Sequence, residues 1–326
     1  MREVIHEYAV ELDWMEPMAK AMDGYLENRQ IKVPESILTG IRYACPVNPA
    51  LTAFLLDVTY HQDVLFKMRN TRDDFIGLYF NLTEGEAIHV MDKVSRSMGR
   101  WSYNLAIIDS ILPGDYLIKA GSKTYMISIF IKKSTFKEVL SKVPNLKDII
   151  DAIFDREKNT VIRFDRMSNH AWWLMNELKK TPFESPLFDI YFEAATYGLM
   201  ADYMDQLIGQ EIILEQVVQE DINKIISSQT YLIDNLNGIF PGISHLSFMA
   251  NMSETKYKKL FKKITGSSAN TFFLNNKLSK AKEMLEEGTH SVNEVATAFS
   301  FFDSSHFIDQ FRNFYGITPK EYLNLL

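Results

Sequence analysis

Short apolar runs separated by turn residues dominate the first 132 residues of the chain. Four runs rich in Ile, Val, Phe and Tyr lie at 51–58, 75–82, 104–112 and 125–131. These residue types favour strands, and the Pro, Gly, Asn and Asp residues between the runs are typical of turns. Several short strands at this spacing predict an antiparallel β-sandwich or barrel over about 37–132. We expect the first 30 residues to be helical.

After residue 133 the apolar spacing changes to that of helices, first at 136–143 and again around Leu174 and Leu178. Beyond two prolines, residues 187–213 predict one long helix. Its apolar stripe comprises Leu187, Tyr191, Ala194, Ala195, Gly198, Leu199, Tyr203 and Leu207. Such a stripe is typical of a helix that faces the core, and a subunit interface is the alternative, because both bury an apolar face.

Residues 241–266 predict two short helices joined by a tight turn. The first helix has Leu246, Met249 and Ala250 on its inward face, and Ser253 is placed to cap the second helix. The apolar face of the second helix comprises Tyr257, Leu260, Phe261 and Ile264. Its other face is rich in lysine. This is the pattern of a helix-turn-helix, in which the second helix fits the major groove of DNA.

The same pattern returns further along the chain. A connecting helix at 270–286 precedes a short helix capped by Ser291, and 303–315 predicts another helix. We assign to the core Leu260, Phe307, Phe311, Phe314 and Tyr322. Two helix-turn-helix units bridged by one helix would present their second helices on the same side. Those helices could enter major-groove segments about one helical turn, roughly 34 Å, apart.

The charge of the chain is unevenly distributed. The 326 residues carry a net charge of −7, but residues 241–326 contain ten basic and eight acidic residues, against 25 and 34 in the first 240. Between Ser253 and Lys282 there are eight lysines and one acid, Glu254. A basic segment in an acidic chain indicates contact with a polyanion, and a solvated lysine face is the alternative.

Cysteine usage and hydropathy exclude several classes of protein. The one cysteine, Cys45, excludes an intrachain disulfide and a multi-cysteine metal site. We expect a buried structural thiol there, with a redox sensor as the alternative. No apolar run approaches the ~20 residues that span a bilayer, and the acidic first residues do not resemble a signal peptide. These features predict a cytoplasmic protein with no membrane partner.

Signatures of catalysis are missing from the sequence. The seven histidines form no H-x-H or H-E-x-x-H pair, and the chain has neither a glycine-rich phosphate loop nor a G-x-S-x-G elbow. We therefore expect no enzyme, cofactor or metal, with His61 and His89 as the alternative metal ligands. Aromatic residues of the β-region fill its core or line a small-molecule pocket: Tyr43, Phe54, Tyr60, Phe66, Tyr79, Phe80, Trp101, Tyr103, Tyr116 and Tyr125.

Residues of the last hundred positions carry a family resemblance. The motif positions are filled by Ala296, Phe301, Ser304 or Ser305, Phe307, Phe311, Gly316, Pro319 and Tyr322. Together with LFKKITG at 260–266 and KLSKAKEML at 277–285, they resemble the AraC/XylS family over about 221–326. The resemblance implies a transcription factor with two helix-turn-helix units. It also implies a cupin-like N-terminal β-domain that senses an effector or mediates dimerisation.

The sequence departs from the family pattern at four positions. Ser300 replaces the usual glycine before Phe301, so we expect the turn to form without a relaxed φ and the second unit to shift. Asp309 stands where a basic residue is frequent, and its charge would repel phosphates. Lys277 and Leu323 replace two arginines.

The candidate DNA-binding residues of the first unit are Thr255, Lys256, Lys258, Lys259, Lys262 and Lys263. We expect Thr255, Lys258 and Lys259 at base edges, because these side chains can donate to guanine or contact a thymine methyl. The other three lysines are expected at phosphates. The candidates of the second unit are Ser304, Ser305, His306, Gln310 and Arg312. The first three lie at a helix start, whose N–H groups favour a phosphate.

The sequence predicts an α+β multidomain protein. We expect a cupin-like β-domain at 1–133, a helical linker or dimerisation region at 134–218, and an AraC-type DNA-binding domain at 219–326. The predicted function is sequence-specific regulation of transcription, as an activator or a repressor. The partners are double-stranded promoter or operator DNA, a small-molecule effector, RNA polymerase and a second copy of the chain. The alternatives are an effector-binding cupin module that has lost DNA binding and a cupin-type enzyme with an accessory DNA-binding domain.

Overall fold

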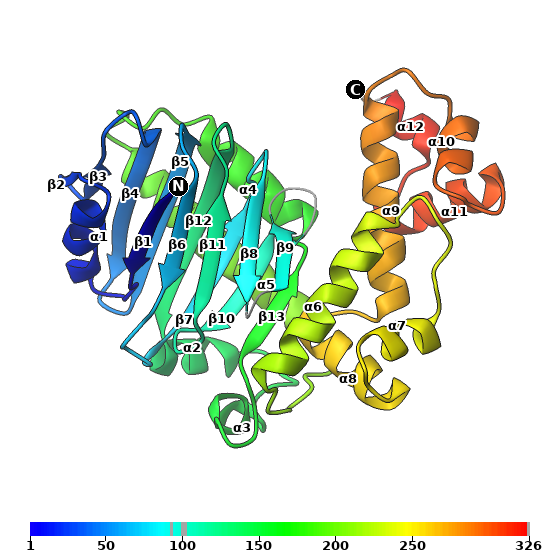
Figure 1. Cartoon of the computed structure of the whole chain (residues 1–326), viewed down its shortest axis with the longest axis horizontal. Helices are drawn as coiled ribbons and strands as arrows, with labels where there is room; N and C mark the ends of the chain where they lie inside the picture. Colours follow the sequence, from blue (N-terminus) through cyan, green and yellow to red (C-terminus); the bar gives the residue numbers. More distant parts are fainter. Residues whose placement is uncertain (92–93, 99–102, 325–326) are drawn as a thin grey trace. The chain divides into compact units, whose positions relative to one another are not determined.

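The structure is a computed structural model that describes residues 1–91, 94–98 and 103–324 (Figure 1). It divides into two compact units, Met1–Val218 and Gln219–Leu326, called here the N-terminal and C-terminal units. The N-terminal unit combines two β-sheets with helices, and the C-terminal unit is helical. The expected α+β class is confirmed. None of the helices in the described ranges is both long and apolar enough to cross a membrane.

The N-terminal unit contains a large and a small sheet. The large sheet has the order β13 (Ile162–Asp165), β10 (Leu105–Asp109), β7 (Phe75–Asn81), β12 (Lys123–Lys132), β5 (Leu51–Tyr60), β4 (Leu38–Asn48), β3 (Gln30–Lys32) and β2 (Tyr25–Glu27). The small sheet has the order β1 (Arg2–His6), β6 (Val64–Met68), β11 (Gly114–Ile118), β8 (Ala87–Met91) and β9 (Val94–Met98). Adjacent strands are antiparallel except for the parallel pair β1 and β6.

Both faces of the large sheet are buried. Along β4, Ala44 packs into the core shared with the small sheet, whereas Tyr43 and Cys45 belong to a core on the opposite face. Phe130 and Ile129 of β12 divide between the two cores in the same way. Successive side chains of a strand point to opposite faces, so a strand buried on both faces has a continuous apolar sequence. This explains the unbroken apolar runs at these strands.

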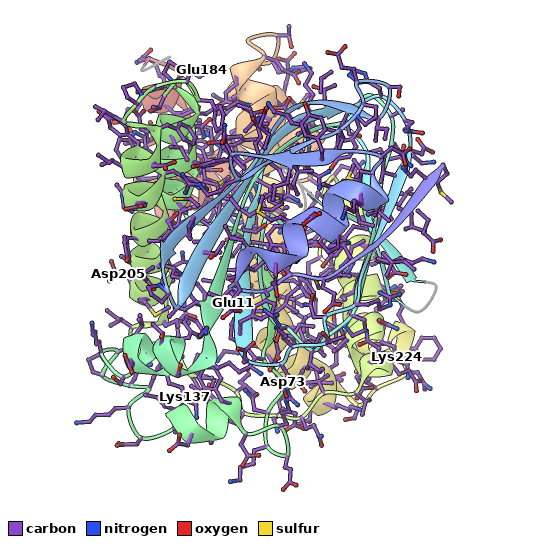
Figure 2. The ribbon with its side chains drawn as sticks, turned by 90° about the vertical axis from the view of Figure 1, so that its left-hand side faces the viewer. Glu11, Asp73, Lys137, Glu184, Asp205 and Lys224 are labelled. Carbon is purple, nitrogen blue, oxygen red and sulfur yellow. The ribbon has the colours of Figure 1, made fainter. Side chains whose placement is uncertain are left out.

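Four helices supply the second of these cores. They are α2 (Lys133–Leu140), α3 (Ile150–Phe154), α4 (Asn169–Lys179) and α5 (Phe188–Leu207). Figure 2 shows α5 alongside the strands, between the labelled residues Glu184, which precedes the helix, and Asp205 near its end. Residues 134–218 therefore share a core with the sheet and lie inside the N-terminal unit.

The helix α5 is shorter than the predicted 187–213, because it ends at Leu207. The next residue is extended, and Gly209 has a φ of 73°. The side chain of Asn145 completes the end: its Nδ2 donates to the carbonyls of Leu207 and Gln210 at 3.1 and 2.8 Å. Its Oδ1 accepts from the N–H of Gly209 at 3.2 Å. These bonds satisfy backbone groups that a helix end leaves unpaired.

The prediction of a helical N-terminus is wrong for most of the first 30 residues. Strand β1 buries Val4 and His6 and pairs with β6, which lies some sixty residues further along the chain. Strands β2 and β3 form a hairpin whose central residues, Asn28 and Arg29, have φ values of 45° and 63°. This conformation matches the twist of hairpin strands. Only the 3-10 turn Leu12–Trp14 and the helix α1 (Met15–Ala21) are helical there.

The C-terminal unit contains the helices predicted within 241–315, together with one helix before them and one after them. They are α6 (Gln219–Asp234), α7 (Ile243–Met249), α8 (Glu254–Thr265), α9 (Ala269–Glu286), α10 (Val292–Ala298), α11 (Ser304–Tyr315) and α12 (Pro319–Leu323). The long helix α9 contributes Leu278, Ala281 and Leu285 to a core with Phe307 and Phe311 of α11. Helices α6 and α8 also pack on α9. The helix α9 therefore contacts both helix pairs, α7 with α8 and α10 with α11.

The burial of His6 predicts a pH dependence of stability. Burial lowers the pKa of His6 to about 4, and the charges of Arg42 and Arg69 act in the same direction. The pKa of an unfolded histidine is about 6.5, so between these values the unfolded chain binds more protons. The free energy of unfolding should therefore fall as the pH falls from about 6.5 to 4. His6→Gln should reduce this slope in urea titrations, whereas His61→Gln, at an exposed position, should not. An unchanged slope in His6→Gln would contradict the prediction.

Candidate nucleic-acid interface

Helices α7 and α8 are joined by a turn with one left-handed residue. Asn251 has a φ of 50°, and its N–H donates to the carbonyl of Phe248 at 3.0 Å. The N–H of Met252 donates to the carbonyl of Ser247 at 3.0 Å. These two bonds form a Schellman motif, and asparagine tolerates the left-handed region better than most residues. Ser253 then caps α8 as predicted, and its side chain accepts a backbone N–H of the first turn.

The helix α8 has one buried and one basic face. The buried residues are Tyr257, Leu260, Phe261 and Ile264, as predicted. The hydroxyl of Tyr257 lies 2.5 Å from that of Ser228 on α6, and the ring of Phe261 meets Phe272 of α9 edge to face. These contacts fix the rotation of α8 about its axis. The outward face therefore presents Thr255, Lys256, Lys258, Lys259 and Lys262 as exposed residues, with Lys263 half-buried.

Among the lysines of this face, Lys256 and Lys258 form the following ion pairs. The Nζ of Lys256 lies 2.7 Å from Oδ2 of Asp221 on α6, a carboxylate that is 13% exposed. The Nζ of Lys258 lies 3.7 Å from Glu254 on the same helix, and both side chains are about half exposed. An exposed ion pair contributes about 0–1 kcal/mol, so Lys258 can exchange its partner at low cost. Lys256 is held by a mostly buried partner and is the less mobile of the two.

The turn between α10 and α11 has the same geometry as the first turn. Ser300 has a φ of 48°, and its N–H donates to the carbonyl of Thr297 at 3.0 Å. The N–H of Phe301 donates to Ala296 at 2.9 Å. Ser300 therefore adopts the left-handed conformation itself, without the relaxed φ that a glycine would have there. Its hydroxyl donates to the carbonyl of Asn237 at 2.7 Å, which offsets part of the strain.

The start of α11 carries a carboxylate. Asp303 is the N-cap, and its Oδ1 accepts the N–H of His306 at 2.7 Å. Ser304 donates its hydroxyl proton to the side chain of Asn293. Ser305 is exposed. The expected phosphate site at this helix start therefore already contains an anionic group, which opposes a second anion.

The rest of α11 is less basic than the sequence suggested. Arg312 lies 2.6 Å from Asp309, one turn earlier on the same exposed surface, and Gln310 is half-buried. Phe314 is 39% exposed, so its assignment to the core is wrong, because the buried face of α11 is limited to Phe307 and Phe311. Met249 of α7 is likewise 47% exposed, contrary to the prediction, since Leu246, Ser247 and Ala250 occupy the inward side.

Lys277 connects the two helix pairs. Its side chain is buried on α9, and its Nζ donates to the carbonyl of Gly238 at 2.6 Å. The ammonium group also lies over the rings of Phe273 and Phe301, at 4.9 and 5.2 Å from their centroids. Burial lowers the pKa of Lys277 to about 8. This lysine therefore holds the turn of the second pair against the linker helix and does not belong to the exposed basic face.

The geometry agrees with a comparison to known families. Residues 246–324 match the model of a family of helix-turn-helix domains. They form an AraC-type helix-turn-helix domain. This AraC-type domain includes the last four residues of α7 and all of α8 to α12, so both turns and both candidate reading helices lie inside it.

Relatives of the AraC-type domain are regulators of transcription by name. An uncharacterised regulator of Escherichia coli K12, YidL, is 35% identical over 71 residues, which are 22% of this chain and 24% of YidL. The regulator GbdR of Pseudomonas aeruginosa is 28% identical over 79 residues, 24% of this chain and 22% of GbdR. The matched segment thus spans about a quarter of the length of these relatives. The structure of ToxT from Vibrio cholerae aligns over 81% of this chain and 98% of ToxT, with 14% identity and a TM-score of 0.30, too low to establish a common fold.

The aromatic residues of the β-region separate into three groups. Those that line an internal cavity between the two sheets are Tyr60, Phe66, Tyr79, Tyr103 and Tyr116. Those in the core beneath the helices are Tyr43, Phe80 and Tyr125. Phe54 packs in the core between the sheets, and Trp101 lies outside the described residues. Some members of the set therefore fill the core, and others line a cavity.

The remaining candidates for redox chemistry or metal binding are Cys45, His61 and His89, and each makes contacts within the fold. Cys45 is buried, and burial raises the pKa of its thiol to about 11. His61 contacts the hydroxyl of Thr39 at 2.9 Å, and the ring of His89 stacks on Tyr116 at 4.5 Å. Across the described ranges, no three His, Cys, Asp or Glu side chains gather where they could hold a metal ion.

Sequence reasoning missed two acidic residues of the AraC-type domain and its neighbouring helix. Asp303 directly precedes α11, and aspartate is one of the preferred N-cap residues, so its position held a local signal. The contact of Asp221 with Lys256 joins residues 35 positions apart, and no spacing rule indicates it.

The left-handed turn at Ser300 predicts the order of stability of three variants. Ser300→Val should lower the free energy of unfolding by about 1–3 kcal/mol, because a β-branched side chain is disfavoured at positive φ and the hydroxyl bond is lost. Ser300→Gly loses the same bond but removes the strain, so it should remain closer to the wild type. Hydrogen exchange of peptides covering 292–315 measures both effects. Equal protection in the valine and glycine variants would show that φ does not limit this turn.

Proposed function

We propose that the chain is a sequence-specific DNA-binding regulator of transcription and that α8 is its main reading helix. The observation that carries this proposal is the basic face of α8, which tertiary contacts on its apolar side hold outward. An exposed helix of this kind, preceded by a short helix and a tight turn, fits the major groove. The regulator names of the matched relatives support the same function.

Each candidate residue of the first unit has a proposed role. Thr255, Lys258 and Lys259 lie within the first two turns of α8, where side chains reach base edges, and we propose that they select the sequence. Lys262 and Lys263, further along the helix, would contact phosphates and position the domain. Lys256 would join them as a phosphate ligand after exchanging Asp221 for the DNA backbone.

The second helix-turn-helix, formed by α10 and α11, would contribute less binding energy than the first, formed by α7 and α8. Its proposed contacts are Ser304, Ser305, His306, Gln310 and Arg312. Asp303 at the helix start and Asp309 beside Arg312 both reduce its attraction for phosphates. The first helix-turn-helix would therefore dominate both the affinity for DNA and the selection of its sequence.

The N-terminal unit is proposed to sense a small effector and to mediate dimerisation. We propose no catalytic activity for the chain. Its place of action would be the cytoplasm, where promoter DNA and RNA polymerase, a further candidate partner, are found.

We propose that α5 carries the surface for a second copy. The predicted stripe divides: Ala195, Leu199, Tyr203 and Leu207 are buried in the core, whereas Leu187 and Tyr191 are exposed. The exposed large apolar side chains of this helix and the residue before it are Leu187, Ile190, Tyr191 and Tyr197, at 50, 63, 52 and 49%. They recur at helical spacing, and a continuous exposed apolar face of this kind is typical of an interaction site. A twofold dimer buries one such face against its copy.

Replacement of the proposed reading lysines should weaken specific binding. Lys258→Ala or Lys259→Ala is expected to cost about 1–3 kcal/mol, roughly 5- to 150-fold, on a site selected from random DNA, and to relax its sequence preference. Lys262→Ala should weaken all sequences alike and reduce the salt slope by about one. Lys20→Ala, on α1 of the N-terminal unit, makes the same charge change and should have no effect. Unchanged binding of both reading variants in mobility-shift assays would exclude α8 as the reading helix.

The apolar face of α5 predicts the oligomeric state. Sedimentation velocity of the wild type at micromolar concentration should give a dimer. Ile190→Glu should give a monomer, because a buried carboxylate without a partner opposes association. Lys180→Glu, at an exposed position at the end of α4, is the control and should remain dimeric. A monomeric wild type, or a dimeric Ile190→Glu variant, would reject this surface.

A further inference from the structure

The space between the two sheets of the N-terminal unit contains an internal cavity. Its cavity volume is about 70 Å³, and it is open in part to solvent. A single water needs roughly 10–15 Å³ on that measure, so the cavity has room for a small organic molecule. The small sheet contributes Phe66 and Tyr116 to its wall, and the large sheet contributes Tyr79 and Met126.

A charged side chain lines this otherwise mostly apolar cavity. Arg42 of β4 is 1% exposed and is among the largest side chains that are fully buried. The adjacent Tyr43 belongs to the core on the opposite face of the sheet, so strand alternation directs position 42 between the sheets. An arginine at a position of this kind must place its guanidinium in a medium of low polarity. Desolvation of an ion costs several kcal/mol unless the ion is paired.

The described residues supply only weak partners for this guanidinium. Nη1 contacts the sulfur of Met22, Nη2 lies 3.5 Å from the sulfur of Met18, and Cζ lies 5.8 Å from the ring centroid of Phe66. Thioether sulfur is a weak acceptor. Nε has no hydrogen-bond partner among the described residues. Each of these contacts leaves the positive charge without a counter-ion.

Neighbouring side chains do not compensate the charge. Among the described residues that line the cavity, none is Asp or Glu. Tyr8 and Tyr60 line it too, and burial raises the pKa of both hydroxyls, so neither is an anion at neutral pH. His6 is neutral at that pH, and its Nδ1 also has no partner in the described part of the chain. The cavity therefore offers one uncompensated positive charge surrounded by rings and methionines.

We propose that this cavity binds a small organic monocarboxylate, whose carboxylate pairs with Arg42 and whose apolar body packs against the rings of Phe66 and Tyr116. A guanidinium and a carboxylate match in geometry and charge, and such a pair is stronger in a medium of low polarity. The apolar wall favours an organic body over an inorganic anion. This assignment gives the chemical class of the effector in the proposed function, and the binding step does not depend on DNA.

The first test compares acids with their neutral amides on the full-length wild type. The ligands are hexanoate and phenylacetate, with hexanamide and phenylacetamide as matched neutral forms, and inorganic phosphate as an anion without an apolar body. At a hundredfold excess over Kd, a ligand should raise the Tm of the N-terminal unit by about 5–10 °C. We expect this shift with at least one of the acids and not with the amides or phosphate. Equal shifts with acid and amide, no shift with either acid, or an equal shift with phosphate would overturn the proposal.

The second test removes the guanidinium. Arg42→Met replaces the guanidinium with an unbranched apolar side chain. Because this deletes a buried unpaired charge, the free protein should be at least as stable as the wild type. The shift produced by the acid should disappear. Arg72→Met, at a surface arginine paired with Glu11 and Asp13, is the matched control and should bind like the wild type. Retention of the shift in Arg42→Met would overturn the role of Arg42, and the acid–amide comparison on the wild type decides the proposal if this variant does not fold.

The two proposals fail separately. Ligand binding is measured here without DNA, so loss of DNA binding in the lysine variants leaves this result unchanged. An acid that binds without altering a mobility shift would support the site and reject only its use as an effector site.

Discussion

The orientation of α8 depends on the burial of its apolar side. Tyr257 contacts α6, Phe261 contacts α9, and Leu260 and Ile264 are buried on the same side. The hydroxyl pair of Tyr257 and Ser228 leaves little freedom of rotation. A lysine-rich helix without such contacts would be a solvated segment with no fixed direction. Because the burial sets which residues face outward, it also determines which of them can meet a groove. Positive charge by itself explains binding to a polyanion but does not select a base sequence. The proposed function therefore rests on this constraint.

The N-terminal unit is organised by a different constraint, the two buried faces of its large sheet. One face meets helices, and the other meets the small sheet across a core that contains the cavity. A strand in this setting has no position at which a charge is free of desolvation cost. Arg42 is therefore informative because it departs from the pattern that its neighbours follow.

The helical elements of the C-terminal unit could be predicted from sequence, because caps such as Ser253 and Ser291 and stops such as Gly266 are local signals. The N-terminal strand β1 could not, since its pairing partner β6 is remote and its alternation covers only five residues. The sequence predicted the exposed position of five of the six candidate residues of α8, but not the ion pair of Lys256, because Asp221 meets Lys256 only after folding. Position 42 could have been recognised as unusual only once the neighbouring strands were known to cover both faces.

Lys277 has a consequence for how the C-terminal unit can move. Its ammonium group contacts the carbonyl of Gly238, which follows α6, and the ring of Phe301 in the turn between α10 and α11. The helix that carries Lys277, α9, packs on both helix pairs. Bending between the pairs would strip this ion of its partners inside a poorly hydrated environment. The two helix pairs should therefore move as one rigid body and keep a fixed distance from each other. An operator whose two contact points are moved apart by a few inserted base pairs would then lose one of them, because the described contacts of Lys277 oppose bending between the pairs.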